Sequence, residues 1–314
     1  MNFTEKNNKN IIMDKVNYAA IDIGSNAVRL LIKSVVNEPD AVEPLSKVQL
    51  LRVPLRLGGD AFTKGKISKK KSKQLISLMK AYKEIMSIYD VKEYRACATS
   101  AMRDSSNGKK LVEEIREKTG IAIEIIDGEE EARLLSDDRV EKITARGGHF
   151  LYVDVGGGST ELNLVSEGQL EWSKSFNIGT VRLLSGMVNP AEKEAFIQFL
   201  EKVSAKYPEV NIIGTGGNIN KLIRLAAPDR CTGQINLLPA EKLHSITEDL
   251  KSYTAQQRMA RYNLKPDRAD VIIPAADIFI SIVDHLKAPG VLVPISGLAD
   301  GIIDSIYLKD KNRD

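Results

Sequence analysis

Cysteine is scarce in this chain, whose 314 residues include only Cys97 and Cys231. Two cysteines this far apart have neither the spacing of a metal-binding motif nor the density of a disulfide framework. Their scarcity excludes a small disulfide-stapled domain and fits a reducing compartment. Proline is also infrequent, with 11 residues, while 43 % of the residues are hydrophobic. This composition is ordinary for a globular protein of roughly two domains and excludes a disordered or fibrous chain.

Long hydrophobic runs are missing as well. No apolar stretch reaches the roughly 20 residues that span a membrane, and the beginning, MNFTEKNNKN, lacks the apolar segment of a signal peptide. We therefore expect a cytoplasmic protein with no membrane partner. Residues 1–14 have little apolar content, so we expect a disordered tail there, with Met13 as an alternative translation start.

Neither sign of charge is in large excess. The net charge of +3 is too small to argue for a specific nucleic-acid partner. The lysines are nevertheless uneven, because six of them crowd together as Lys64, Lys66, Lys69, Lys70, Lys71 and Lys73. A solvated loop leading into a helix explains this run. A landing surface for a long polyanion, held by salt-sensitive attraction, is the functional alternative.

What the sequence does contain is one pattern that occurs twice. IDIGSNAVRLLI begins at Ile21, and VDVGGGSTELNLV begins at Val153. In each copy an Asp follows an apolar residue, a turn of small residues comes next, and a second strand-like run follows. The copies are separated by about one domain length. The chain is therefore predicted to contain two related lobes.

The repeated pattern indicates phosphate binding. A Gly- and Ser-containing turn between two strands presents several backbone N–H groups at one point, which suits an anion. The Asp that precedes each turn would repel a bare phosphate, so we expect it to hold a metal ion or a metal-bound water. A single copy would more often be an ordinary hairpin turn. Two copies at domain spacing favour a cleft for a phosphorylated ligand.

The hydrophobic periodicity predicts an α/β fold in which both lobes follow the same order of elements. In the first lobe we expect strands at 18–23, 28–35, up to about 51, 93–98 and 121–125, and helices at 74–89, 108–118 and from Glu129. In the second we expect strands from 150, 160 and 169 and at 210–214 and 291–294, and helices after 190 and at 267–287.

The lobes are placed at 15–145 and 146–297, joined by a short hinge near 145–149 that allows closure over a ligand. The last helix, 298–310, has no lobe of its own to finish. Packing back on the first lobe is one way in which it can be buried.

Four further segments place chemically useful side chains after strand-like runs. CATSAMRDSSNG carries Thr99, Ser100 and Arg103, and Arg matches phosphate geometry, although a salt-bridge role is the alternative. DGEEEARL opens a helix with three carboxylates, which either complement the helix dipole or supply a general base. FNIGTVRL, with Gly179 and Arg182, and IIGTGGN add glycine turns, the latter at a helix start where an anion can dock.

Taken in order, these motifs resemble those of the exopolyphosphatase/guanosine pentaphosphate phosphatase family: DIGSN, RLG, ATSAMR, DGEEEARL, DVGGGSTEL, NIGTVRL, GTGGN and PDRADVIIPAA. The resemblance covers residues 18–305. It implies two ribonuclease-H-like lobes of the actin-like ATPase superfamily, with a phosphate-binding cleft between them. The chain resembles the short members, which lack an additional C-terminal helical domain.

The resemblance also implies a function. We expect a hydrolase that uses water activated by Glu and a divalent cation, Mg²⁺ or another, to release terminal phosphate. The substrates implied are inorganic polyphosphate and pppGpp, and both stay open. The expected partners are polyphosphate or guanosine penta/tetraphosphate, and a homodimer is common in the family.

By this resemblance the general base falls on Glu131, with Glu130 as the fallback, and Arg103 is a phosphate ligand. The metal side of the cleft carries Asp154, Glu161 and Asp22. The phosphate-binding positions are Gly24, Ser25, Asn26, Gly156, Gly157, Gly158, Ser159 and Gly216. Two segments depart from the family pattern, because GLADGII lacks the Arg and Glu of its GLREG stretch and GTGGN lacks the more usual Ser.

Two other functions would use the same features. An ATP-dependent kinase of the same superfamily has paired phosphate turns but transfers the phosphoryl group to a hydroxyl instead of water. A non-catalytic regulator would bind an alarmone or nucleotide without turnover, and the presence of Glu131, Arg103 and both turns argues against it.

Overall fold

The computed structural model describes residues 15–36, 38, 41, 43–135, 147–226, 228, 235–294 and 297–312. The expected tail at 1–14 with Met13, Cys231, and residues 145 and 146 of the expected hinge lie outside the described residues. Within the described ranges, no helix combines the length and the apolar character that a membrane span requires.

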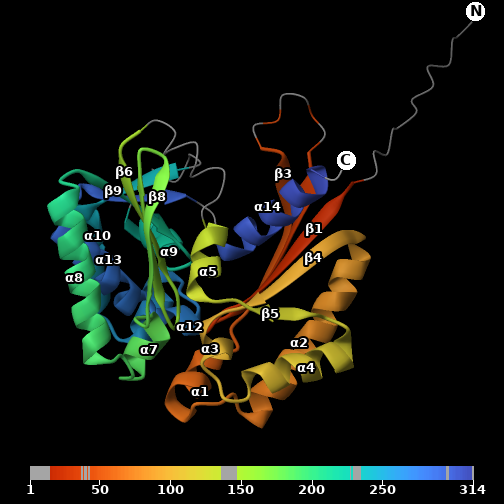
Figure 1. Cartoon of the computed structure of the whole chain (residues 1–314). Coiled ribbons are helices and arrows are strands. Elements are labelled where there is room, and N and C mark those ends of the chain that lie inside the picture. Colours follow the sequence, from red (N-terminus) through yellow and green to blue (C-terminus); the bar gives the residue numbers. More distant parts are fainter. Residues whose placement is uncertain are drawn as a thin grey trace, which may run out of the picture.

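The first lobe is built on a five-stranded mixed sheet in the order β3-β2-β1-β4-β5 (Figure 1). Its strands are β1 (Asn17–Ile23), β2 (Val28–Val35), β3 (Leu45–Val53), β4 (Val91–Ala98) and β5 (Ile123–Ile125). Its helices are α1 (Leu57–Lys64), α2 (Lys69–Ile88), α3 (Ser100–Arg103), α4 (Gly108–Thr119) and α5 (Gly128–Leu135).

The second lobe is built on a six-stranded sheet in the order β10-β11-β9-β6-β7-β8. Its strands are β6 (His149–Val155), β7 (Thr160–Ser166), β8 (Gln169–Phe176), β9 (Val210–Thr215), β10 (Ile235–Pro239) and β11 (Gly290–Pro294). Its helices are α7 (Thr180–Leu184), α8 (Pro190–Lys206), α9 (Ile219–Ala226), α10 (Ala240–Lys251), α11 (Ala255–Tyr262), α12 (Pro266–Ala269) and α13 (Ile272–Leu286), and α14 (Leu298–Lys311) follows.

The two sheets share one topology. When β3-β2-β1-β4-β5 is laid on β8-β7-β6-β9-β11, each neighbouring pair agrees in direction, antiparallel through the first three strands and parallel thereafter. Of the described strands, β10 alone, antiparallel to β11, has no counterpart in the first sheet. The predicted α/β fold with two ribonuclease-H-like lobes is confirmed.

Two helix boundaries differ from the expectation for local reasons. Helix α2 begins at Lys69 instead of 74, because the Ser68 hydroxyl accepts from the Lys71 amide at 3.4 Å and caps the helix there. Most of the lysine run therefore lies on the first turns of a helix and not in a loop. The apolar stretch at 267–287 is two helices, because Pro274 cannot donate to the carbonyl of Asp270, and α13 restarts at Ile272 with this proline in its first turn.

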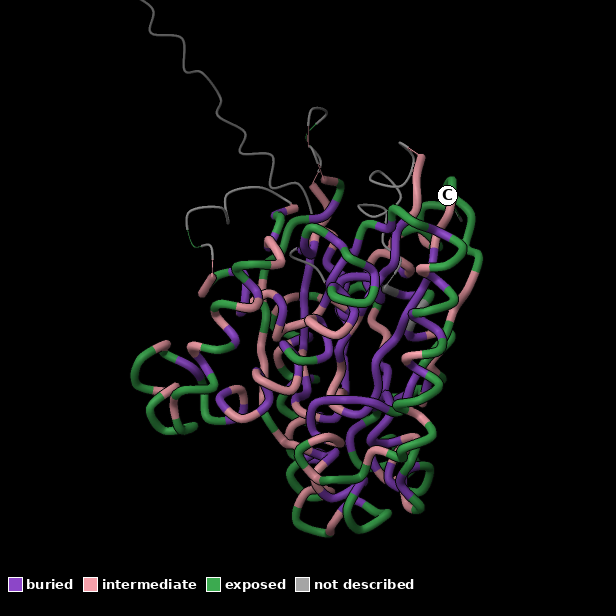
Figure 2. The backbone as a smooth tube through the Cα atoms, turned by 90° about the vertical axis from the view of Figure 1, so that its left-hand side faces the viewer, coloured by how far each residue is buried: buried purple, intermediate pink, exposed green. Residues whose placement is uncertain are grey.

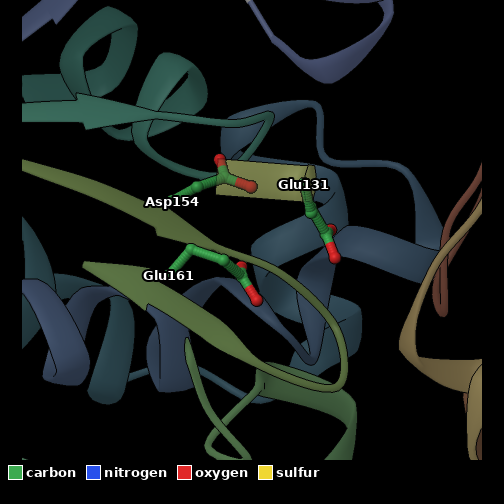
Figure 3. A group of neighbouring side chains, drawn as sticks. All are labelled: Glu131, Asp154 and Glu161. Atoms are coloured by element: carbon green, nitrogen blue, oxygen red, sulfur yellow. The ribbon is translucent and has the colours of Figure 1, made fainter. Parts of the chain in front are cut away.

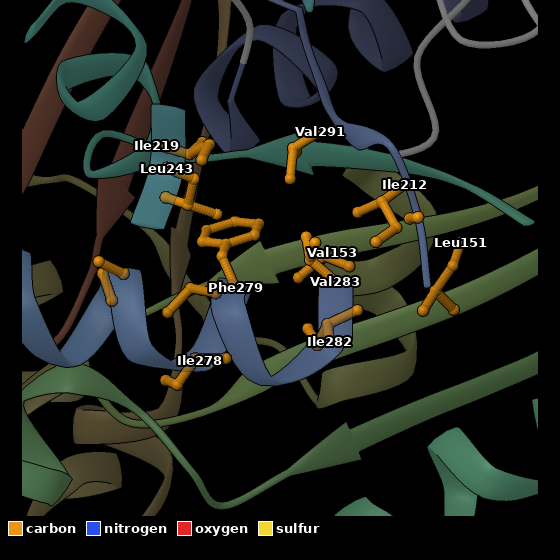
Figure 4. Close-up of a cluster of buried hydrophobic side chains, with 14 of the residues drawn as sticks. Leu151, Val153, Ile212, Ile219, Leu243, Ile278, Phe279, Ile282, Val283 and Val291 are labelled. Carbon is orange, nitrogen blue, oxygen red and sulfur yellow. The ribbon is translucent and has the colours of Figure 1, made fainter. Parts of the chain in front are cut away.

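Each lobe has its own apolar core, and buried positions follow the strands and the inner helix faces (Figure 2). In the second lobe, Phe279 of α13 packs among Val291, Ile212 and Val153 from three neighbouring strands (Figure 4). In the first lobe, Leu75 and Met79 of α2 cover one sheet face.

The other face of the first sheet is covered by α14. Ile302, Ile303 and Ile306 of this helix form a separate core with Ala20 of β1 and Cys97 of β4. Helix α5 lies between the lobes, where it packs against both α14 and the β7–β8 hairpin (Figure 1). The residue at which one lobe ends and the next begins stays a prediction, since the connecting residues lie outside the described ranges.

Candidate active site

The two repeated turns have the same backbone structure. The amide of Gly24 donates to the carbonyl of Ala27 at 3.1 Å, and the amide of Gly156 donates to the carbonyl of Ser159 at 3.0 Å. A Cβ on either glycine would stand 3.1 Å from that same carbonyl oxygen, so a side chain would crowd the turn. The sequence repeat is therefore a structural repeat, with one turn closing each β-hairpin.

Each turn is fixed by the segment that follows its lobe's third strand. The Ser25 carbonyl accepts from the Gly58 amide at 2.8 Å, and the Gly157 carbonyl accepts from the Val181 amide at 2.8 Å. Among the described residues, the amides of Ser25, Asn26 and Gly157 donate to no carbonyl. These N–H groups remain available to an anion, and all three residues line one cavity.

The turns also meet each other across the lobes. A Cβ on Gly157 would stand 2.9 Å from the Ser25 Cβ, and one on Gly158 would stand 2.3 Å from the Ser100 hydroxyl. The Ser25 and Ser100 hydroxyls are 2.9 Å apart and buried. Only glycine permits this approach, so the second turn rests directly on the first lobe. Gly158 is consequently packed against protein and is absent from the cavity wall.

The two hairpins differ in the residue opposite the Asp. In the first, Asp22 pairs in register with Arg29, and the two side chains form an ion pair. In the second, Asp154 pairs in register with Glu161. Asp154 accepts from the Thr215 hydroxyl at 2.8 Å, and Glu161 accepts from the Ser175 hydroxyl at 2.9 Å. The first hairpin is neutral at this position, whereas the second carries two adjacent carboxylates.

Glu131 reaches this acidic pair from α5. The helix begins where Asp127 caps the Glu130 amide at 2.8 Å, and the Glu131 carboxylate then lies beside those of Asp154 and Glu161 (Figure 3). One oxygen from each of these three residues lies within 4.8 Å of the others. Glu131 and Glu161 are buried, with exposed fractions of 6 % and 1 %.

Burial and mutual repulsion disturb these carboxyl groups. Burial first, then the charges of Glu161 and Asp154, raises the pKa of Glu131 well above its usual value. Burial and Asp154 raise the pKa of Glu161 to about 7, and burial also raises that of Asp154. Titratable groups perturbed in this way, grouped in a cavity, are typical of functional sites.

The trio fits a divalent cation. One oxygen of Glu131 and one of Glu161, the Oε2 atoms, are buried without a hydrogen-bond partner. Hard divalent cations prefer carboxylate oxygens, and an ion here would satisfy both atoms and offset the repulsion. Asp22, which we expected on the metal side, is not one of these three residues, and its carboxylate pairs with Arg29.

The other catalytic candidates have separate places. Arg103 donates to the Ile126 carbonyl at 2.8 Å, and its Nη1 lies 3.8 Å from the Glu131 carboxylate, so it borders the trio without lining the cavity. Glu130, the fallback base, pairs with Arg95 at 3.0 Å and also with Arg133, and these bonds keep its pKa low. Its carboxylate is therefore engaged away from the trio.

The cavity between the lobes has a volume of about 530 Å³ and is lined by both turns, Glu131 and Asp154. It is also crowded with cations, namely Arg29, Lys47, Arg52, Lys221, Arg224 and Arg268. Burial, Arg52 and Arg29 lower the pKa of Arg268 to about 10. Like charges at this density favour an anionic ligand.

The GTGGN turn separates the acidic and the basic parts. A Cβ on Gly216 would stand 2.9 Å from the Asp154 carboxylate, and one on Gly217 would stand 2.9 Å from the Arg268 guanidinium. Gly216 has a φ of 100°, which glycine adopts without strain. A ligand that passes this turn would meet carboxylates first and guanidinium groups next.

Ion pairs also join the two lobes directly. Arg52 pairs with Asp267 at 2.5 Å and Arg56 with Asp270 at 2.6 Å. Arg182, singled out in the sequence, pairs with Asp104 at 2.5 Å, donates to the Gly158 carbonyl at 2.8 Å and stacks on the Phe62 ring at 4.0 Å. The role of Arg182 is to fasten the second turn to the first lobe.

The sequence alone did not point to the arginine and lysine side chains that line the cavity. Arg29 stands three residues after Asn26, and its place opposite Asp22 follows from hairpin register, so this signal was present. Arg268 lies within the quoted PDRADV segment, but no role was given to it. Arg52, Lys221 and Arg224 come from a strand and a helix with no motif, and only the fold brings them together.

The Ppx/GppA phosphatase family model matches residues 35–310. Exopolyphosphatase 2 of Mycobacterium tuberculosis is 28 % identical over 311 residues, with 92 % of this chain and 97 % of that protein covered. Exopolyphosphatase 1 of Mycobacterium bovis is 25 % identical over 299 residues, with 90 % and 86 % covered.

Solved structures superpose on this chain over most of its length. The Ppx/GppA family member of Aquifex aeolicus superposes with a TM-score of 0.74 at 26 % identity, covering 94 % of this chain and 99 % of that one. An exopolyphosphatase from Cytophaga hutchinsonii superposes with a TM-score of 0.81 at 23 % identity, covering 93 % and 98 %, which supports the fold. Because the family model matches residues 35–310, which is most of the sequence, this chain belongs to the Ppx/GppA phosphatase family.

Proposed function

We propose that this protein hydrolyses the terminal phosphoanhydride bond of inorganic polyphosphate, pppGpp or both. The observation that carries this proposal is a cavity lined by Glu131, Asp154 and several cations, with the Glu161 carboxylate beside the first two. A ligand with a terminal phosphate to be cleaved and a long anionic remainder matches both parts. The exopolyphosphatase names of the relatives point to the same chemistry.

In this proposal the two turns bind the terminal phosphate. The amides of Ser25, Asn26 and Gly157 would donate to its oxygens, and Arg103 would approach it from beside Glu131. Glu131 would orient and deprotonate the attacking water, because it is buried beside the two other carboxylates and its raised pKa favours accepting a proton. No covalent bond to the protein is needed, since position and electrostatics supply most of the catalysis of phosphoryl transfer.

Asp154 and Glu161 would hold a divalent cation, Mg²⁺ by expectation, with Glu131 at its edge. Such an ion would neutralise charge on the phosphate oxygens. Arg268, Arg29 and Arg52 would bind the remainder of the substrate beyond the GTGGN turn. Arg29 and Arg52 are already paired with Asp22 and Asp267, but a cluster of three guanidinium groups suits either polyphosphate or the second diphosphate of pppGpp, so the substrate is decided by measurement.

The decisive test compares Glu131→Gln with Glu130→Gln. These neighbours receive the same substitution, but only Glu131 lies in the trio, whereas Glu130 is bound to Arg95 and Arg133. We expect Glu131→Gln to lower kcat by roughly 10²–10⁴ with KM little changed, which is the usual size of general-base catalysis. Glu130→Gln should stay within a few-fold of the unmodified protein. The assay is phosphate release with Mg²⁺ from long polyphosphate, tripolyphosphate and pppGpp in parallel.

Each other result has a defined meaning. Equal loss in both variants would remove Glu131 from its role as base. Release of ADP from ATP only with an added acceptor would establish the kinase alternative, and tight binding of pppGpp without phosphate release by the unmodified protein would establish the regulator. A homodimer and a cytoplasmic location remain expectations, checked by light scattering and fractionation.

A further inference from the structure

The helix that carries Glu131 is held between two close contacts, one near each end. Its first residue, Gly128, meets β8 of the second lobe, and its Leu134 meets α14. Both contacts depend on glycine. Helix α5 is therefore located by elements that the reaction scheme above does not use.

The contact with α14 is backbone against backbone. A Cβ on Gly301 would stand only 1.6 Å from the Leu134 carbonyl oxygen, so no side chain fits unless α5 and α14 separate. Glycine within a helix costs roughly 0.5–1 kcal/mol relative to alanine, and the close approach explains its presence in α14. Helix α14 is itself anchored, because buried Lys33 of β2 pairs with Asp304 at 2.9 Å and with Asp300 at 3.2 Å.

The contact with β8 links the two glutamates directly. A Cβ on Gly128 would stand 2.6 Å from the Ser175 Cβ and 2.8 Å from its hydroxyl. That same hydroxyl donates to Glu161 at 2.9 Å. Ser175 thus touches the first residue of the Glu131 helix and orients Glu161 at once, so a shift of α5 at this point moves one carboxylate relative to the other.

We propose that Gly128, Ser175 and Gly301 are positioning residues, a clamp that sets the distance between the Glu131 carboxylate and those of Glu161 and Asp154. This inference rests on the proposed role of Glu131. Because α14 covers the first lobe and β8 belongs to the second, the trio assembles only when both lobes hold α5. The position of the Glu131 carboxylate therefore depends on both lobes.

The first experiment compares Gly301→Ala with Gly59→Ala. Gly59 is also a helical glycine, in α1, but a Cβ there would meet only the flexible Lys71 ammonium at 3.6 Å. We expect Gly301→Ala to lower kcat at least about tenfold with KM kept within about twofold, since a displacement of about 1 Å at a catalytic group can cost 10²-fold. Gly59→Ala should match the unmodified protein. Thermal unfolding of each variant confirms that folded protein is assayed.

A second experiment keeps the proposal testable should Gly301→Ala fail to fold. Gly128→Ala introduces a milder clash with a side chain, and Ser175→Gly removes the atoms that it meets. We expect Gly128→Ala to lower kcat about tenfold alone but to cost nothing further in the Ser175→Gly background. A penalty of the same size in both backgrounds would mean that Gly128 acts elsewhere, and the clamp would be rejected.

Failure of the clamp and failure of the proposed function are separate outcomes. Activity in the unmodified protein with Gly301→Ala and Gly128→Ala as active as Gly59→Ala would overturn the clamp alone. If the unmodified protein releases no phosphate, calorimetric titration with Mg²⁺ alone decides: about tenfold weaker binding by Gly301→Ala supports the clamp, and equal or absent binding overturns it.

Discussion

The two β-hairpins that form the floor of the cavity have the same backbone but opposite chemistry. Opposite Asp22 the first carries Arg29, and opposite Asp154 the second carries Glu161. Arg29 neutralises Asp22, whereas Glu161 adds a second carboxylate beside Asp154, and the repulsion between the two carboxylates favours a bound cation. The difference at one cross-strand position therefore leaves one copy of the repeated hairpin neutral and gives the other two carboxylates that could hold a cation.

The largest effect is expected when the second hairpin is made to imitate the first. In Glu161→Arg the new guanidinium would pair with Asp154 and expel a divalent cation. We expect phosphate release to fall at least 10²-fold, because the charge stabilisation of a bound ion is worth several kcal/mol. The measurement is kcat across a Mg²⁺ titration. Glu161→Gln, which removes the charge without adding a cation, should be partly rescued at high Mg²⁺, and full activity in Glu161→Arg would refute the metal assignment.

A smaller effect is expected when the first hairpin loses its cation. Arg29→Met would leave Asp22 buried and unpaired, and breaking a buried pair typically costs 3–5 kcal/mol. Because the Arg29 side chain is 30 % exposed, we expect about 2–3 kcal/mol in urea unfolding. The double variant Asp22→Asn/Arg29→Met should recover most of this loss. If the double variant is as unstable as the single one, the ion pair is not the reason for the cost.

The smallest effect is a pH dependence of stability, to which Glu161 of the second hairpin contributes together with Asp154 and Glu131. The pKa of Glu161 is raised from 4.5 to about 7 in the fold, so the folded protein binds more protons than the unfolded chain between these values. Stability of the metal-free protein should accordingly fall as pH rises from about 4.5 to about 7. Chemical denaturation with EDTA measures this slope.

Two controls test whether this pH slope comes from Glu161. Saturating Mg²⁺ should flatten it, because an ion bound to the ionised carboxylates favours the charged forms. Glu161→Gln should make this pH slope of stability shallower without Mg²⁺. A slope of the same size in Glu161→Gln would assign the effect to other groups.

Sequence alone predicted the parts of this structure that short segments encode. The strand at 28–35 and both hairpin turns follow from alternation and glycine placement. The family resemblance named Glu131 as a base and Asp154 and Glu161 as metal ligands, but it grouped Asp22 with the last two, whereas the structure places Glu131 beside them. Predicting that Arg29 faces Asp22 and Glu161 faces Asp154 requires knowing which residues pair across each hairpin. The clamp on α5 was beyond reach, because neither Gly128 nor Gly301 occupies a turn, and only the tertiary approach of two backbones explains them.

Most of the lysine run lies on a helix and not in the solvated loop that the sequence suggested. Lys69, Lys70 and Lys71 occupy the first turn of α2, where positive charge opposes the helix dipole. Lys71 is bound to the Arg56 carbonyl and lies 3.7 Å from Asp60, which gives it a structural role. A polyanion-binding role for the exposed members remains a prediction.

The position of α14 has a consequence for biosynthesis. Ala20, Leu31 and Cys97 emerge from the ribosome early, yet the helix that covers them is made some two hundred residues after the last of them. At roughly 5–20 residues per second, that face of the first sheet waits on the order of ten seconds or more for its cover. The core of the second lobe in turn takes Val291 and Val293 from β11, which is made just before α14, so the cores of both lobes depend on the last segments to be translated.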